Sequence, residues 1–211
     1  MKIKPLLARL QSAIGRYDLM EQMVLLPAAK KSMSDKDSPA KSVKLIVAYD
    51  GSPNSHTALD IAFCIAHQTH LATNTQVNVQ VVYVLEKQAD LTDDYNFKLN
   101  KNNRDLEYVD CDLPQSQTLL LSPAKPNLSS ISAAEKADTI LWQAKTLAQE
   151  WQNYFKSHLR FGELCSELKK VVELETADAL FLGCQSINHP LIDKLDSNFP
   201  CAVLGIPQCL D

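Results

Sequence analysis

The stretch VKLIVAYDGSPNSHTALDIA, residues 43 to 62, determines how we interpret this chain. It begins with apolar and β-branched residues that predict a buried strand over 43–49. Ser52 followed by Pro53 is typical of a helix N-cap and first helical position, and apolar residues then repeat at helical spacing. The stretch therefore predicts a strand, a short polar turn that contains Asp50, and a helix.

The alternation of strand and helix continues through the rest of the chain. A nearly continuous run of valines at 77–85 is typical of a strand that is covered on both faces. Further strands are predicted at 158–161, 178–183 and 201–206. Because helical patterns separate these strands, we predict an α/β fold with one open, parallel, five-stranded sheet and helices on both of its faces.

The helices after the second strand differ in how strongly the sequence predicts them. A period of 3.6 residues is sustained from Ala133 to Trp151, which predicts a long helix. A shorter helix is predicted after Gly162, and another of two or three turns around Pro190, with Ser186 or Asn188 as its cap. Residues 86–131 contain few side chains of the buried type, so we expect a long insertion after the second strand.

The first 42 residues differ in pattern from the rest of the chain, and we divide the sequence into regions 1–42 and 43–211. Apolar residues at helical spacing predict an amphipathic helix over 3–16. It packs on its own domain or on a dimer mate, or alternatively binds a partner or a membrane surface. Residues 27–42 are rich in Lys, Ser, Asp and Pro, and they predict a linker.

Charge and cysteine content exclude several classes of function. The formal net charge of −4 argues against nucleic acid as a partner, because duplex binders carry a basic surplus. The six cysteines form no CxxC pair, which predicts a reducing, cytoplasmic location. No apolar stretch reaches the roughly 18 to 20 residues that a membrane span requires, so we expect no span.

Glycine is scarce, and this limits the kinds of phosphate site that the chain can form. Average usage of about 7% would give about fifteen glycines, whereas the chain has five, and no two of them lie close together. Loops of the GxGxxG or GxxxxGKS type need several glycines within a few residues, so that backbone N–H groups can close on phosphate. Both loops are therefore excluded.

Three segments, in order, carry a resemblance to a known family. VKLIVAYDGSPNSHTALDIA, ELCSELKKVVELETADALFLG and FPCAVLGIP resemble the opening, the later stretch and the closing strand of the universal stress protein (UspA-like) domain. The resemblance implies the adenine nucleotide alpha hydrolase-like (HUP) fold. It also implies a homodimer in which the last strand pairs with its copy, through Cys201, Ala202, Val203, Leu204, Gly205 and Ile206.

The family has ATP-binding and non-binding versions, which differ in a glycine motif after strand four. In the binding version the adenosine positions correspond to Asp50 and Val84 here, and the phosphates lie on G-x-x-G-x9-G-[ST]. In this chain Gly183 fills the first glycine position, but Ser186 stands at the second and Asp196 at the third. The positions that would hold ATP with magnesium, if a nucleotide binds, are Asp50, Gly51, Ser52, Val84, Gly183, Ser186 and Ser197.

These substitutions predict that ATP is not bound in the family's usual way. Ser186 adds a Cβ where close backbone approach is needed, and Asp196 sets a carboxylate beside a polyphosphate. The connection from Gly183 to Pro200 is also too short for both a wide loop and a full helix. A structural reading of the first turn is that Asp50 or Ser52 caps the helix and Gly51 forms the turn.

Other candidate residues suggest weaker alternatives. His67 and His70 can share a helix face and begin a metal site, but no further ligands stand at a telling spacing. Cys184 and His189 could form a nucleophile pair, and Cys184 could sense redox state. Trp151 is expected in the core, and Trp142 in the core or at an interface.

We therefore carry two hypotheses of function from the sequence. The first is a non-catalytic, dimeric regulatory or interaction protein with an unknown protein partner. The alternative is a stress sensor that binds ATP or another adenine nucleotide, with slow or no hydrolysis. A third, an adenylating enzyme on the same type of sheet, requires an S-G-G-x-D-S loop that DGSPNS does not match.

Overall fold

The structure is a computed structural model, and it describes residues 3–28, 42–86, 106–108, 133–195 and 198–207. Most of the predicted linker over 27–42 and most of the predicted insertion over 86–131 lie outside the described residues.

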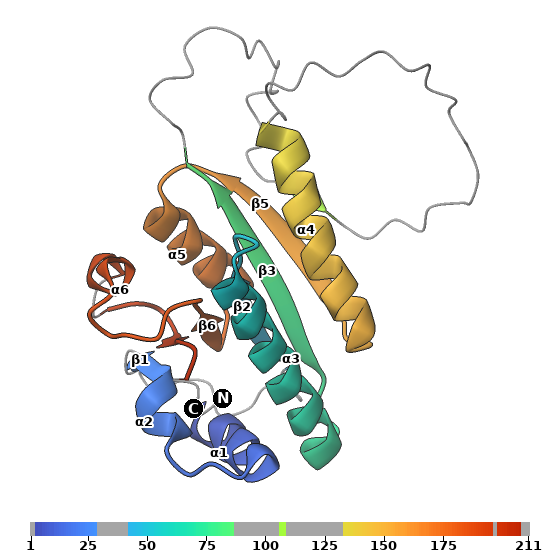
Figure 1. Cartoon of the computed structure of the whole chain (residues 1–211), viewed down its shortest axis with the longest axis vertical. Helices are drawn as coiled ribbons and strands as arrows, with labels where there is room; N and C mark the ends of the chain where they lie inside the picture. Colours follow the sequence, from blue (N-terminus) through green and yellow to red (C-terminus); the bar gives the residue numbers. More distant parts are fainter. Residues whose placement is uncertain (1–2, 29–41, 87–105, 109–132, 196–197, 208–211) are drawn as a thin grey trace, which may run out of the picture.

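The described residues form one seven-stranded sheet with the strand order β1-β7-β6-β2-β3-β5-β4 (Figure 1). The five inner strands run parallel, which confirms the predicted α/β fold. At the two edges β1 pairs antiparallel with β7 and β4 pairs antiparallel with β5, and neither edge strand was predicted. The strands are β1 (Val24–Leu26), β2 (Val43–Ala48), β3 (Val77–Leu85), β4 (Leu106–Tyr108), β5 (Phe155–Phe161), β6 (Ala179–Phe181) and β7 (Ala202–Leu204).

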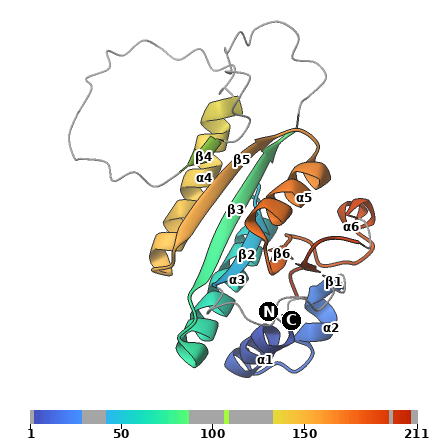
Figure 2. The same cartoon turned by 180° about the vertical axis from the view of Figure 1, so that it is seen from behind.

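Helices cover both faces of the sheet because the inner strands are apolar on both sides. In β2, Leu45 and Val47 belong to one hydrophobic core and Ile46 to the other, as the alternation of side chains along a strand requires. One face carries α1 (Ile3–Ile14), α2 (Leu19–Met23), α3 (Pro53–Thr73) and α4 (Ala133–Glu150). The other carries α5 (Leu164–Glu175) and α6 (Pro190–Lys194), and Figure 2 shows α5 crossing that face.

The N-terminal segment is part of this core. Leu6, Leu7 and Leu10 of α1 are buried in the same core as α3, and so are Leu19 and Met23 of α2. Burying one such side chain contributes about 1.5–3 kcal/mol, so the segment adds substantially to the stability of the sheet. Of the alternatives for this helix, the structure has it packed on its own domain.

The last strand does not present a free edge in a single chain. The resemblance implies that the apolar strand at 201–206 pairs with its copy in a homodimer. In the structure the outer side of β7 is already paired with β1 of the same chain, so a single chain has no free edge there. The cause is tertiary, because a three-residue strand such as β1 has no pattern of its own in the sequence.

The helix starts confirm one predicted cap and correct another. Ser52 caps α3 by accepting a hydrogen bond from the Ser55 N–H at 3.2 Å, with Pro53 in the first turn as predicted. At α6 the predicted cap at Ser186 or Asn188 is wrong, because the ring of His189 accepts the Leu191 N–H at 3.2 Å. His189 directly precedes Pro190, which supplies the first helical position.

Within the described residues, no helix is both long enough and apolar enough to cross a membrane. Cys64, Cys165 and Cys184 are free thiols.

Candidate functional site

A cleft of about 640 Å³ lies at the carboxyl ends of β2, β3 and β6. This is the edge where open parallel sheets bind their ligands. Among the predicted site residues, Asp50, Ser52, Val84 and Gly183 line the cleft, whereas Gly51 and Ser186 do not and Ser197 lies outside the described residues. Lining residues that were not predicted from the sequence include Tyr49, Ser55, Glu86, Lys136, Glu163 and Lys194.

The turn after β2 is held together by its own polar groups. The Asp50 carboxylate accepts the Ser52 N–H at 2.9 Å, and Gly51 has a positive φ of 78° that favours glycine. Burial raises the pKa of Asp50, but hydrogen bonds from Ser52 outweigh it, so that the pKa lies below its usual value. Of the two predicted caps, Ser52 is the one that caps α3, and Gly51 lies in the turn as predicted.

Gly183 lies where the end of β6 approaches the start of α3. A Cβ added at Gly183 would lie 2.8 Å from the Ser55 nitrogen and 2.9 Å from the Asn54 carbonyl carbon. Both are backbone atoms, so a side chain cannot be accommodated without moving β6 away from α3. The glycine is thus explained by packing between two elements, without any ligand.

The N-terminus of α5 forms another wall of the cleft. Glu163 caps this helix, and its carboxylate accepts N–H groups from Cys165 at 3.3 Å and from Ser166 at 2.7 Å. The Ser166 hydrogen bond is the main cause that holds the pKa of Glu163 below its usual value, and the nearby Lys194 acts in the same direction. Glu163 is therefore ionised at neutral pH.

Glu163 could have been found from the sequence. It lies just after the predicted strand at 158–161, and residues that come after parallel strands gather at the carboxyl edge of the sheet.

The connection from β6 to α6 lines the cleft at both of its ends, through Gly183 and Cys184 and through His189. Gly183 and Cys184 line the cleft, and the chain then reaches Pro190, the start of α6. Ser186, the predicted second phosphate position, is exposed and accepts the Asn188 N–H at 3.1 Å. The connection from β6 to α6 therefore spans residues 182–189. The predicted third phosphate position at 196–197 lies outside the described residues.

Two thiols and an imidazole lie at the cleft, but their surroundings do not favour nucleophilic chemistry. Burial raises the pKa of the Cys184 thiol, and burial together with the charge of Glu163 raises the pKa of Cys165. A raised pKa lowers the thiolate fraction that would react. His189 is engaged as the cap of α6.

The paired histidines of the first helix lie elsewhere. His67 and His70 border a separate cavity of about 210 Å³, together with Trp151 and Tyr154. The described residues contain no cluster of three or more groups that could hold a metal ion. Trp151 packs against Phe63 as expected for a core residue, whereas Trp142 is 67% exposed, which places it at the surface.

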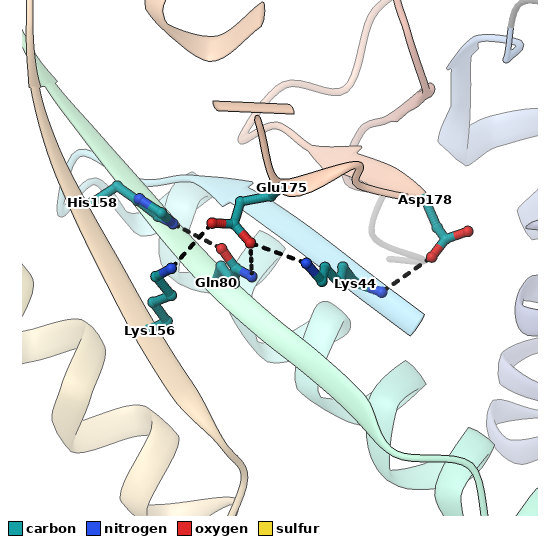
Figure 3. A network of polar contacts seen from close by, with 6 residues as sticks. All are labelled: Lys44, Gln80, Lys156, His158, Glu175 and Asp178. Atoms are coloured by element: carbon teal, nitrogen blue, oxygen red, sulfur yellow. Dashed lines mark hydrogen bonds and ion pairs between the residues drawn. The ribbon is translucent and has the colours of Figure 1, made fainter. Parts of the chain in front are cut away.

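A second polar cluster, which we call the carboxylate clamp, lies on the α5 face of the sheet (Figure 3). The Glu175 carboxylate accepts hydrogen bonds from Lys44 at 3.2 Å, Gln80 at 3.0 Å and Lys156 at 3.1 Å. The ring of His158 in turn bonds the Gln80 side-chain oxygen at 2.7 Å. The clamp therefore joins three strands, β2, β3 and β5, to the end of α5.

The clamp keeps Glu175 charged. Burial raises its pKa, but the hydrogen bonds from Gln80, Lys156 and Lys44 outweigh burial and lower it to about 2. Because both carboxylate oxygens are engaged within the protein, the clamp supports the fold and offers no open position for a ligand. The cleft is the candidate functional site.

An open, mainly parallel sheet with a cleft at its carboxyl edge defines a class of α/β folds. Comparison with known proteins narrows this class through the solved structures. No protein-family model matches the chain. No curated protein matches it either.

The chain has the fold of the universal stress proteins, which confirms the resemblance at the level of the fold. It is similar to a universal stress protein family structure from Burkholderia pseudomallei, at a TM-score of 0.51 and 17% identity, covering 78% of this chain and 96% of that one. A universal stress protein from Archaeoglobus fulgidus in complex with dAMP matches at a TM-score of 0.44 and 14% identity over 79% of this chain and 99% of that one. A universal stress protein in complex with cAMP matches at a TM-score of 0.39 and 13% identity, covering 66% of this chain and 71% of that one.

Proposed function

We propose that this chain is a non-catalytic regulatory or interaction protein with a universal stress protein-like fold, whose cleft does not bind ATP through a polyphosphate site. One observation carries the proposal. Three backbone N–H groups at the starts of α3 and α5, those of Ser55, Cys165 and Ser166, are bonded to the chain's own Ser52 and Glu163 side chains. Such N–H groups are what a phosphate would need.

The charges at the cleft point in the same direction. A phosphate near α5 would approach the ionised Glu163, and Asp50 is held in the charged form at the opposite turn. Both carboxylates are exposed, so solvent screens their repulsion of a phosphate. Lys136 and Lys194 offset part of this repulsion, but both are exposed to solvent.

The non-catalytic part rests on the groups that could react. The thiols of Cys184 and Cys165 have raised pKa values, and His189 is engaged in capping. These features support a binding role over nucleophilic catalysis.

Calorimetric titration with ATP and magnesium tests the proposal. We expect no saturable binding up to about 1 mM. The Glu163→Gln variant keeps an oxygen acceptor for the α5 cap and removes the charge, so it should bind ATP more tightly than the wild type does. Adenosine, which lacks phosphates, is the control and should bind no more weakly than ATP. Wild-type binding of ATP at or below about 10 μM would contradict the proposal.

A second candidate function is the adenine-nucleotide sensor. The observation that favours it is the cleft itself. Asp50 and Val84 both line this cleft, which has a volume of about 640 Å³. It requires ATP binding that an Asp50→Asn variant weakens, since this variant keeps the acceptor for the Ser52 N–H. Unchanged affinity in Asp50→Asn would count against this candidate.

Two expectations from the sequence stay predictions. A homodimer through β7 would require β1 to leave the edge that it occupies, so we do not include it in the proposed function. A cytoplasmic location is supported by the free thiols of Cys64, Cys165 and Cys184. Fractionation of cells that express the chain tests the location.

A further inference from the structure

The outer edge of β7 is occupied by β1 of the same chain. Val24 is the antiparallel partner of Leu204, and Leu26 is the partner of Val203. The Gly205 N–H donates to the Met23 carbonyl oxygen at 2.8 Å, which extends the contact beyond the strand. An edge without such a partner presents N–H and C=O groups on which another strand can form. Here the chain itself supplies that partner.

The end of β7 is shaped to accept β1. A Cβ at Gly205 would overlap the Cys184 carbonyl oxygen and would lie 2.7 Å from the Leu25 Cδ1 atom. Leu25 is 4% exposed and lies in the α5-side core together with Val203. A larger residue at position 205 would therefore displace Leu25. The glycine suits a leucine that arrives from β1.

The segment that carries β1 packs against both faces of the sheet. Leu7 of α1 and Met23 of α2 are buried in the core on the α3 face, whereas Leu25 is buried in the core on the α5 face. Helix α1 packs directly against α3 (Figure 1). A strand added from a second copy of β7 would fill the hydrogen bonds of the edge but would not supply these buried side chains.

We propose that residues 3–26 are a built-in strand donor that closes the β7 edge against strand addition by a second copy of this chain. The N-terminal segment of the same chain thus covers the β7 edge and the adjoining face of α3. This inference is independent of what the cleft binds.

A disulfide trap in the full chain tests which copy supplies β1. Val24 and Leu204 are directly paired, and paired positions in antiparallel strands are about 4.5–5.5 Å apart at Cα, within the range of a disulfide. The Val24→Cys/Leu204→Cys variant should form a 24–204 bond within one chain. Non-reducing electrophoresis should show monomer mass, and peptide mapping should show the link.

The same experiment has outcomes that overturn the proposal. A 24–204 link between two chains, a 204–204 link, or no link at either position would each contradict closure of the edge within one chain. The single variants Val24→Cys and Leu204→Cys are the controls for bonds to native cysteines.

Opening the edge is an independent test. Leu25→Asp places a carboxylate in the buried position and should release β1, so that light scattering at micromolar concentration shows dimers or larger species where the wild type is monomeric. Tyr17→Asp is the matched control, because Tyr17 lies in the same segment and is 91% exposed. It should stay monomeric.

Two results of this second test would overturn the proposal: a dimeric wild type that Leu25→Asp converts to monomer, or a folded Leu25→Asp variant that stays monomeric. Circular dichroism reports whether Leu25→Asp is folded. If it is unfolded, the disulfide trap decides.

Discussion

The carboxylate clamp and the cleft contain similar side chains, yet they differ in what these side chains are free to do. In the clamp, Glu175 is bonded to Lys44, Gln80 and Lys156 in the middle of the sheet. In the cleft, Glu163 and Ser52 cap helices at the rim, and Lys194 is exposed to solvent. The clamp is closed and the cleft is open.

A cluster of charged residues is therefore a poor indicator of a binding site by itself. In both regions the hydrogen-bonding capacity of these groups is used within the protein, and the regions differ in the space that remains. In the clamp it is used by strands that must hold together. In the cleft it is used by helix termini, and a volume remains for a ligand.

The largest expected effect is on the clamp. Glu175→Ala leaves Lys44, Lys156 and the buried Gln80 amide without their common acceptor, and breaking such a buried pair costs about 3 kcal/mol. Urea unfolding monitored by circular dichroism measures this loss. Glu173→Ala, on the exposed side of the same helix, is the matched control and should change stability by less than about 0.5 kcal/mol. Equal losses in both variants would show that the clamp is not a special contributor.

The pH dependence of the unfolding free energy should reflect the ionisation of the Glu175 carboxylate. Because the pKa of Glu175 is lowered from 4.5 to about 2, its contribution is complete above the unfolded value and is lost as pH falls toward 2. A shift of this size corresponds to about 3 kcal/mol. The difference in unfolding free energy between the wild type and Glu175→Gln should therefore shrink between pH 5 and pH 2. A difference that stays constant over this range would disprove the assignment.

A smaller effect is expected at the floor of the cleft. Gly183→Ala places a methyl group against the backbone of Asn54 and Ser55, so the end of β6 must move, at a cost of about 2 kcal/mol. Gln185→Ala, two residues further on and exposed, is the control. Urea unfolding of both variants measures the difference. If Gly183→Ala is as stable as the control, the close approach of β6 to α3 is not a packing constraint.

The smallest expected effect is at the rim. Ser52→Ala removes the side-chain acceptor of the Ser55 N–H, and the loss of such a cap costs about 1 kcal/mol. Ser166→Ala is a suitable control, because the Ser166 side chain is exposed near the start of α5 and its N–H bond to Glu163 is kept. Thermal unfolding of the pair compares them. A larger loss in Ser166→Ala would argue against the capping role of Ser52.

The parallel sheet could be predicted because its signals are local. The valine run of β3 matches Val77–Leu85 as predicted, and the Ser52-Pro53 start of α3 is in place. These segments are long and periodic, so the predicted bounds of the strand and the predicted start of the helix agree with the structure. The edge strands could not be predicted, since β1 and β4 have three residues each and depend on distant partners.

The candidate site was predicted only in part, for a related reason. Asp50, Ser52, Val84 and Gly183 line the cleft because each one ends or follows a strand. The cap at His189 is not predicted from the sequence, because an imidazole acceptor is not among the usual cap residues, and only the hydrogen bond from the Leu191 N–H to its ring shows this role. Glu163 directly follows Gly162, after which the sequence predicts a helix and no site residue.

The pairing of β1 with β7 also affects the order in which parts of the chain can fold during synthesis. Val24 is synthesised long before its partner Leu204. Leu25, which is buried in the same core as Val203, must therefore wait for the last strand while the chain emerges, and contacts this distant in sequence slow folding. Strand β1 can therefore complete its pairing only once β7 has left the ribosome.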